Sequence, residues 1–227
     1  GSIAATRLSA NTTSGFSVVE YPGNNTAGAT IAHGLSVVPE MVFVKQLDNG
    51  TATWRVYDKT LGANQCIYLN LTEAASGAGN GHWNNTSPTA TVFTVRDGDG
   101  VNSSSTNYIA YCFHSVEGYS KVGSYVGNND ADDNTFVYCG FKPAMVLTKA
   151  TADSGQDWTL RDNKRNTYNV VDTALEPNSN TADDTQSNFN IDLLSNGFRP
   201  YNNNTQGAGN AAQLYIAFAE SPFKYSN

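Results

Sequence analysis

One set of sequence blocks occurs twice along the chain, in the same order and at similar spacing. A Gly-aromatic-Ser block that leads to Tyr and then Gly-Asn-Asn begins at Gly15 and again at Gly118, and a Pro-x-Met-Val block begins at Pro39 and again at Pro143. The remaining matches pair Trp54 and Asp58 with Trp158 and Asp162, Phe93 with Phe198, and Tyr108–Phe113 with Tyr215–Glu220. This agreement predicts two homologous units of roughly 105 residues each, a usual size for one domain.

The repeat sets the expected domain boundaries. Unit 1 is predicted to span residues 15–116 and unit 2 residues 117–227. Residues 1–14, which begin Gly-Ser without an initiator Met, are expected to be a cloning remnant and a linker. The connection Val116–Ser120 is short, so the two units are expected to pack against each other.

The apolar segments have the composition of β-strands. They are about five residues long, rich in β-branched and aromatic residues, and separated by Gly, Pro, Asn and Ser. The clearest are Met41–Val44, Val92–Val95, Tyr108–Phe113, Met145–Leu147 and Leu214–Phe218. No segment keeps a 3.6-residue apolar stripe, so no long helix is expected.

Several of these strands are apolar on both faces. In Met41–Val44 all four residues are apolar, although side chains alternate between the faces of a strand. Such strands are expected to be covered on both sides. The sequence therefore predicts an all-β chain of two homologous β-sandwich-like units in tandem.

Charge and cysteine content exclude several classes of protein. The 227 residues include 13 basic and 20 acidic side chains, for a formal net charge of −7. This balance argues against a nucleic-acid-binding face and against docking on an anionic membrane. No apolar run approaches the roughly 18 residues of a membrane helix. Three cysteines without metal-site spacing predict neither a disulfide framework nor a zinc site.

The repeated blocks resemble a repeat domain of tailed-bacteriophage structural proteins, found in long tail fibres and minor virion proteins. The matching residues of the first half are Gly15–Val19, Tyr21, Gly23–Asn24, His33–Leu35, Pro39–Met41, Val44–Lys45, Trp54, Tyr57–Lys59, Tyr68–Asn70 and Tyr108–Phe113. Those of the second half are Glu117–Lys121, Gly123–Tyr125, Phe141–Ala144, Leu194–Phe198 and Tyr215–Tyr225. The resemblance implies an extracellular virion part and carries no catalytic residues.

The predicted ligand-binding residues centre on a polar loop. Trp83 lies in the segment Gly79–Asn85 without apolar neighbours, so it is either a ligand contact or an anchor for the loop. Trp54 and Trp158 share strand faces with aliphatic residues, which favours burial over stacking on a sugar. The predicted set consists of Trp83, His82, Asn84, Asn85, Tyr57 and Arg161.

Two acidic segments are candidates for calcium, although no cofactor is expected. Asp97 and Asp99 lie in a Gly-rich segment that lacks the later Glu of a calcium loop, so a hairpin turn is the favoured interpretation. Asp132 and Asp133 lie in an acidic cluster without the glycine of such a loop, and this cluster is more typical of a solvated loop.

The chain is not expected to be an enzyme. The three histidines lie in no metal-binding or catalytic motif, and no nucleophile motif is present. The favoured function is a non-catalytic tail-fibre domain that binds a glycan or protein receptor on the host surface. The expected partners are that receptor, other virion proteins and further copies in a homotrimer. A purely architectural virion module and a polysaccharide-degrading enzyme are the alternatives.

Overall fold

The computed structural model shows an all-β chain that divides into two compact units. It describes residues 1–77, 81–98, 100–130, 134–185, 190–201 and 212–222, and these contain strands and no helix. Unit 1 comprises Gly1–Leu71 and Ala75–His114, and unit 2 comprises Thr72–Ala74 and Ser115–Asn227. The all-β prediction is therefore confirmed.

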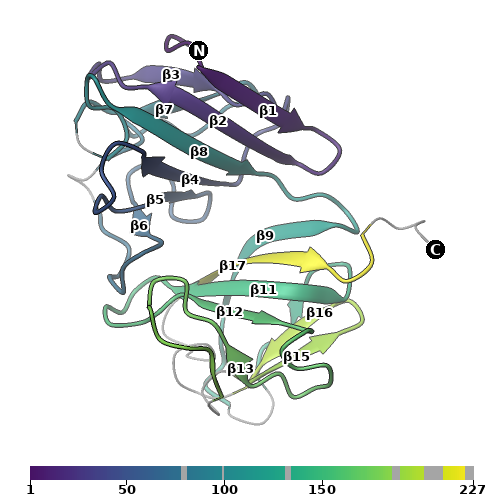
Figure 1. The fold of residues 1–227 in the computed structure, drawn as a ribbon. Helices are drawn as coiled ribbons and strands as arrows, with labels where there is room; N and C mark the ends of the chain where they lie inside the picture. Colours follow the sequence, from purple (N-terminus) through teal and green to yellow (C-terminus); the bar gives the residue numbers. More distant parts are fainter. Residues whose placement is uncertain (78–80, 99, 131–133, 186–189, 202–211, 223–227) are drawn as a thin grey trace. The chain divides into compact units, whose positions relative to one another are not determined.

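Unit 1 is built from two antiparallel sheets (Figure 1). Its large sheet has the strand order β1 (Arg7–Asn11), β2 (Phe16–Pro22), β8 (Asn107–Phe113), β4 (Met41–Gln46), β5 (Arg55–Asp58) and β6 (Ile67–Tyr68). Its small sheet pairs β3 (Ala29–Ala32) with β7 (Val92–Val95). The alternation of side chains along the large sheet decides which of its residues reach the core.

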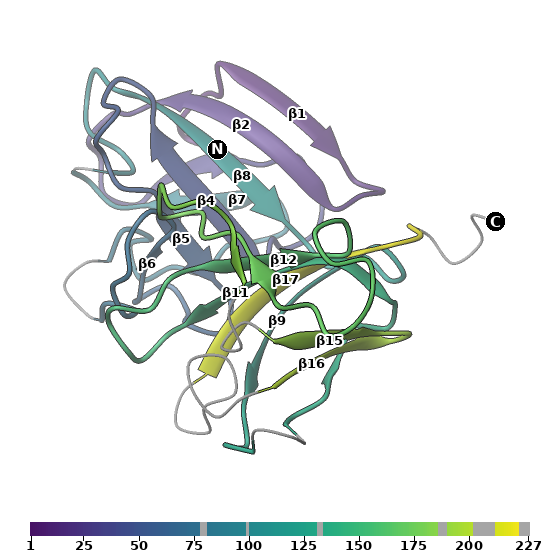
Figure 2. The same ribbon diagram turned by 60° about the horizontal axis from the view of Figure 1, so that its bottom comes forward.

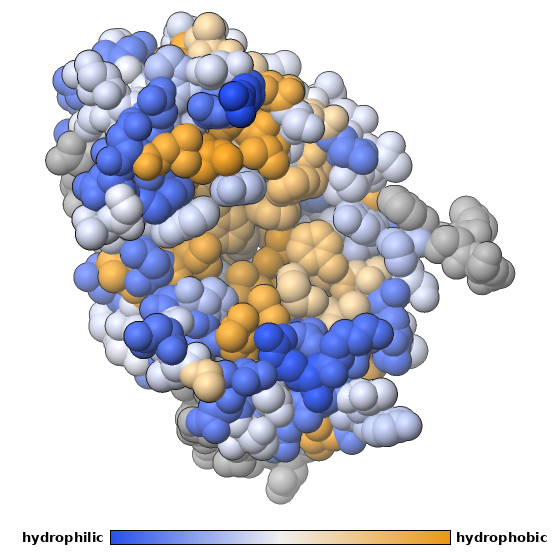
Figure 3. Space-filling model, in the orientation of Figure 1, coloured by the Kyte–Doolittle hydropathy of each residue, from blue (hydrophilic) through white to orange (hydrophobic). Residues whose placement is uncertain are grey.

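The core of unit 1 contains residues of both sheets, as in a β-sandwich. In β8, Tyr108, Ala110 and Cys112 are buried, while the residues between them are half-buried. Tyr21 of β2 stacks on Tyr108 at 5.4 Å between ring centroids and meets Phe93 of β7 edge-on at 6.0 Å. On the face drawn in Figure 3, hydrophobic residues also reach the surface over β2 and β8, among hydrophilic ones.

Unit 2 has a four-stranded sheet and two smaller sheets (Figure 2). The four-stranded sheet has the order β12 (Thr159–Asp162), β11 (Pro143–Ala150), β17 (Ala212–Ala219) and β9 (Ser120–Val126). The smaller sheets join β10 (Val137–Tyr138), β16 (Gly197–Pro200) and β15 (Ile191–Leu194), and β13 (Thr173–Ala174) with β14 (Asp184–Thr185). Phe198 packs edge-on against Tyr125 at 5.7 Å and Tyr215 at 5.3 Å in the core.

The matched sequence blocks occupy corresponding strands of the two units. The strand order β2-β8-β4-β5 of unit 1 has the counterpart β9-β17-β11-β12 in unit 2. Phe93 and Phe198 also correspond, since each lies on a strand of a small sheet, β7 and β16. This shared order is what a duplication produces, and descent of the units from one ancestor stays a prediction.

The unit boundaries differ from those expected. Residues 1–14 belong to unit 1, because β1 pairs with β2 and Ile3 is buried with a backbone hydrogen bond to Thr30. Thr72–Ala74 belong to unit 2, where the Gly155 amide donates to the Thr72 carbonyl at 2.9 Å. Neither feature has a local sequence signal, since both depend on partners far along the chain.

The three cysteines of the chain lie in its interior. Cys66, Cys112 and Cys139 are buried and free. Burial raises the pKa of each thiol to about 12.

Within the residues described, no helix has the length and apolar character needed to cross a membrane.

Candidate functional site

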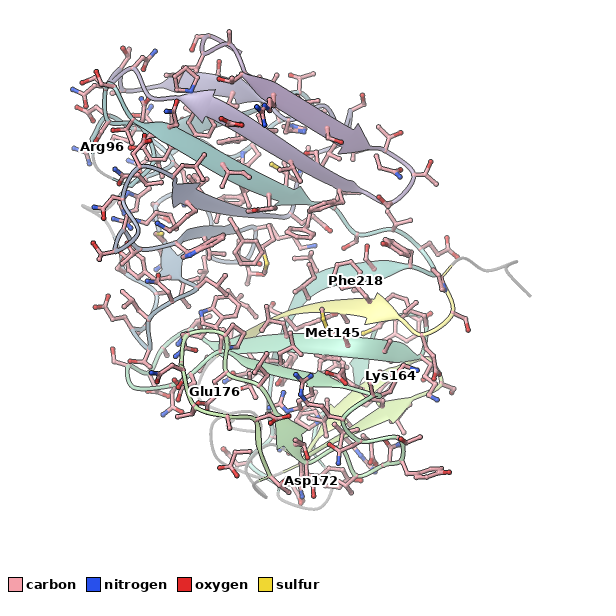
Figure 4. All side chains as sticks on the ribbon, viewed as in Figure 1. Arg96, Met145, Lys164, Asp172, Glu176 and Phe218 are labelled. Carbon is pink, nitrogen blue, oxygen red and sulfur yellow. The ribbon has the colours of Figure 1, made fainter. Side chains whose placement is uncertain are left out.

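One pocket of unit 1 has predominantly polar walls. It has a volume of about 580 Å³ and is lined by Asn64, Asn84, Asn85, Ser87 and Arg96, with Ala63 and Gly81 completing the wall. We call it the asparagine pocket. The loop after β5 contributes residues 63 and 64, the loop before β7 contributes residues 81–87, and Arg96 follows the end of β7 directly (Figure 4).

Two consecutive asparagines shape the loop at the pocket. Asn84 and Asn85 both have a φ of about 50°, which is a left-handed conformation that asparagine tolerates better than most residues. The Asn84 amide donates to the Gly81 carbonyl at 3.0 Å, and the Thr86 amide donates to the Trp83 carbonyl at 3.0 Å. These two bonds close a tight turn with both asparagine side chains at the pocket wall.

Trp83 anchors this loop in the core and is not exposed to a ligand. Its side chain is 2% exposed and belongs to the hydrophobic cluster of unit 1. It meets Tyr57 edge-on at 5.8 Å, and Tyr57 is itself buried and hydrogen-bonded to Ser87. Burial raises the pKa of the Tyr57 hydroxyl. Of the two interpretations of Trp83, the structure therefore supports the anchor, because its indole is buried in the core against Tyr57.

His82 lies beside two guanidinium groups. Its Nε2 accepts a hydrogen bond from Nε of Arg55 at 3.3 Å, and its carbonyl accepts one from the Arg96 amide at 2.9 Å. Burial, together with the charges of Arg55 and Arg96, lowers the pKa of His82 to about 4. His82 is thus neutral at pH 7 and acts as an acceptor for Arg55. The cation of Arg55 also lies over the ring of Tyr68, at 5.2 Å from its centroid.

Arg161 is not a surface residue. Its side chain lies in unit 2, is fully buried, and donates from Nη1 to the Thr148 hydroxyl at 3.2 Å. Burial lowers its pKa to about 10, and interaction with Tyr125 opposes that change. The prediction that Arg161 contacts a ligand at the surface is wrong, because the inward side of β12 holds its guanidinium in the core.

Trp54 and Trp158, which directly precede β5 and β12, are buried to different degrees. Trp158 is fully buried. Trp54 is half-buried and stacks on Tyr111 with ring centroids 6.0 Å apart. Neither lines the asparagine pocket.

The predicted metal ligands are not assembled within the described part of the chain. Asp97 is exposed and paired with Arg96 at 3.2 Å. Asp99, Asp132 and Asp133 lie outside the described residues. No group of three His, Cys, Asp or Glu side chains among the described residues is arranged to hold a metal ion. The flanking Gly98 and Gly100 have positive φ, and Gly98 bridges Asn102, as in the predicted hairpin turn.

Five of the six predicted ligand-binding residues therefore come together in unit 1, but only Asn84 and Asn85 line the pocket. Tyr57 and Trp83 support it from the core, and His82 fixes Arg55 beside it. Sequence reasoning missed Asn64, Ser87 and Arg96. No local pattern marks these residues, because three separate segments bring them together.

The chemistry of the pocket is that of hydrogen bonding. Its walls present three amide side chains, one hydroxyl and one guanidinium, which together donate to and accept from polar groups. The Ser87 hydroxyl is engaged with Tyr57, and the Nε2 of His82 is engaged with Arg55. Neither pair has the nucleophile-and-base arrangement that activates a hydroxyl.

Comparison with known proteins places the chain in a family. The profile of the family described as Domain of unknown function (DUF7483) matches residues 1–222. No curated protein and no solved structure matched the chain.

Proposed function

We propose a function for this chain from its site, because the chain belongs to a family, DUF7483, whose own function is unknown. The chain is a non-catalytic binding domain of a tailed-phage virion, and it holds a host-surface glycan in the asparagine pocket. The observation that carries this proposal is the pocket wall of three asparagine amides, a serine hydroxyl and a guanidinium group.

The pocket suits a saccharide in size and chemistry. Its volume of about 580 Å³ falls in the range of small-molecule sites. Sugar hydroxyls donate and accept at the same atom, and an asparagine side chain offers both a donor and an acceptor. Three asparagines on one wall therefore match a polyhydroxylated ligand better than an apolar one.

The charges beside the pocket favour an acidic saccharide. Arg96 lines the pocket, and its charge and that of Arg55 are both close enough to lower the pKa of His82. Asp97 pairs with the Arg96 guanidinium at 3.2 Å, so an anion in the pocket would share this guanidinium with Asp97, while Arg55 adds a second positive charge nearby in a chain with a net charge of −7. A sugar carboxylate in the pocket would accept hydrogen bonds from the Arg96 guanidinium.

The virion setting rests on the sequence resemblance to phage fibre and minor virion proteins. A weak glycan site gains avidity of about 10²–10⁴ when several copies bind together. We therefore propose a homotrimer on the phage surface, in contact with other virion proteins. Sedimentation equilibrium of the purified chain tests this assembly, and a monomer at micromolar concentration contradicts it.

The binding function is tested on an array of bacterial surface polysaccharides, both acidic and neutral. We expect retention of an acidic polysaccharide. Asn64→Ala should weaken that binding about two- to tenfold through loss of one hydrogen bond. Asn180→Ala is the matched control, because Asn180 is also exposed but lies outside the pocket.

Three outcomes would contradict the proposal. They are the absence of any retained polysaccharide, equal binding by the Asn64→Ala and Asn180→Ala variants, and release of reducing ends from the bound polysaccharide. The last result would point to a degrading enzyme instead. Asn64 is exposed, so its truncation leaves the core intact and the comparison interpretable.

A further inference from the structure

A second pocket lies in unit 2, at the loop that follows β12. Its volume is about 170 Å³, and its walls include Asn163, Thr167, Tyr168 and Asn169. Figure 4 labels Lys164 and Asp172, which lie at the two ends of this loop. We call this site the Tyr168 pocket.

Tyr168 is an exposed aromatic residue at a pocket wall. Its side chain is 83% exposed, the largest exposure among the described large hydrophobic residues. Packing an apolar face against a solvent-exposed aromatic ring is favourable, because it removes apolar surface from water. Within the described part of the chain, the hydroxyls of Thr167 and Tyr168 have no hydrogen-bond partner, so both can bond to a ligand beside that ring.

The loop that holds Tyr168 is fixed by its asparagines. The Asn169 side chain donates to the Leu193 carbonyl at 3.1 Å and accepts from the Leu193 amide at 3.0 Å. Asn166 accepts from the Thr173 amide at 2.9 Å, and its Nδ2 donates to Asp172 at 2.9 Å. A loop held at both ends in this way loses less conformational entropy when a ligand binds.

The base and rim of the pocket are also fixed. Val171 and Leu193 line the base and belong to the hydrophobic core of unit 2. At the rim, Asn163 donates to Glu220 at 2.8 Å, and Glu220 forms an ion pair with Lys142 at 2.8 Å. The hydrogen bond from Lys142 lowers the pKa of Glu220. This pair leaves the rim close to neutral.

The loop occupies the same position in unit 2 as a loop of the asparagine pocket does in unit 1. Asp58 ends β5 and its Oδ1 accepts from the Thr60 amide at 2.7 Å. Asp162 ends β12 and its Oδ1 accepts from the Lys164 and Arg165 amides, both at 2.8 Å. The loop that begins in this way lines a pocket in each unit, with Asn64 in the first and Tyr168 in the second.

We propose that the Tyr168 pocket is a second saccharide site, which takes a single neutral pyranose ring stacked on Tyr168. The exposed aromatic face meets the C–H face of the sugar, and the hydroxyls of Thr167 and Tyr168 reach its edge. The small volume limits the site to one ring. This site is separate from the asparagine pocket and does not depend on it.

The test is a titration of the full chain with four methyl pyranosides, those of glucose, galactose, mannose and N-acetylglucosamine, followed by amide NMR shifts. We expect at least one of them to shift the amides of residues 166–171 in a saturable way at millimolar concentration. Tyr168→Ala should weaken that binding about three- to tenfold, because it removes the stacking surface. Tyr168→Phe keeps the stacking surface and loses only the hydroxyl, so its loss of affinity should be smaller, about two- to threefold.

Tyr138→Ala is the matched control, because Tyr138 is also an exposed tyrosine of unit 2 at 64%. It should bind like the unchanged chain. The proposal is overturned if none of the four sugars shifts this loop, or if Tyr168→Ala binds as tightly as Tyr138→Ala. The asparagine pocket is tested separately by the acidic polysaccharides and the Asn64→Ala variant, so failure of one site is distinguished from failure of the other.

Discussion

Replacing His82 with glutamine should make the chain more stable in acid than the original chain. In the folded state His82 accepts a hydrogen bond from Arg55 and is close to the charge of Arg96. Protonation would place a third cation in this partly buried corner and would abolish the acceptor. Glutamine keeps an acceptor for Arg55 but does not titrate.

The magnitude follows from the pKa of His82, which falls from 6.5 to about 4 on folding. The unfolded chain therefore binds a proton between about pH 6.5 and pH 4 that the folded chain does not bind. Stability from this residue is fully present above pH 6.5 and is lost as the pH falls towards 4. A difference of about 2.5 pKa units at about 1.36 kcal/mol each gives a loss of about 3 kcal/mol.

The assay is urea unfolding of the original chain and of His82→Gln at pH 7 and pH 4, with the free energy of unfolding obtained at each pH. At pH 7 the two proteins should agree within about 1 kcal/mol, because both offer Arg55 an acceptor. At pH 4 the variant should be the more stable by about 2–3 kcal/mol. Burial also lowers the pKa of His33, but His33 is present in both proteins and cancels in the comparison.

Two results would refute this reasoning. One is an NMR titration in which His82 of the folded chain protonates near pH 6.5. The other is an equal loss of stability by both proteins between pH 7 and pH 4. Either would mean that burial and the charges of Arg55 and Arg96 do not oppose the charged imidazole.

Three further predictions concern the core and the turns. Gly197→Ala should lower the free energy of unfolding by about 1–3 kcal/mol, because the new Cβ would lie 2.1 Å from the Val137 carbonyl oxygen. Gly50 has open space around it, so Gly50→Ala should change the free energy of unfolding by less than about 1 kcal/mol. Equal effects of the two substitutions in urea unfolding would contradict this. Trp83→Phe should cost less than Trp83→Ala, for which about 3–5 kcal/mol is expected, because the buried Nε1 has no hydrogen-bond partner to lose among the described residues. A thiol reagent at pH 7 should label none of the three cysteines in the folded chain and all three in denaturant, since burial raises each pKa to about 12; rapid labelling of the folded chain would show that the core opens.

The strands were predictable because their signal is local. The five apolar segments named from the sequence are the strands β4, β7, β8, β11 and β17. The expected cover on both faces of Met41–Val44 is also found, since all four residues are buried. The duplicated blocks likewise predicted which strands of the two units correspond, as the shared strand order shows.

The site was only partly predictable. Asn84 and Asn85 were candidates because they lie in the polar loop that holds Trp83, and both line the pocket. The burial of Trp83 was left open by its polar sequence neighbours, since the apolar partners of its indole come from elsewhere in the chain. Arg161 was expected at the surface because an isolated charge in a sequence gives no sign of a buried hydroxyl partner such as Thr148.

The sequence by itself determined the all-β class, the positions of the main strands and the repeated order of the blocks. The alternation of apolar residues and the turn residues act over a few neighbouring positions, and the repeat appears when the two halves are compared. All three can therefore be recognised from the sequence alone. Only the tertiary structure decided that Asn64, Asn84 and Arg96 share one wall, and that Tyr168 projects beside a second pocket. These sites depend on the approach of loops distant in the chain, and that approach is set by the packing of the sheets beneath them.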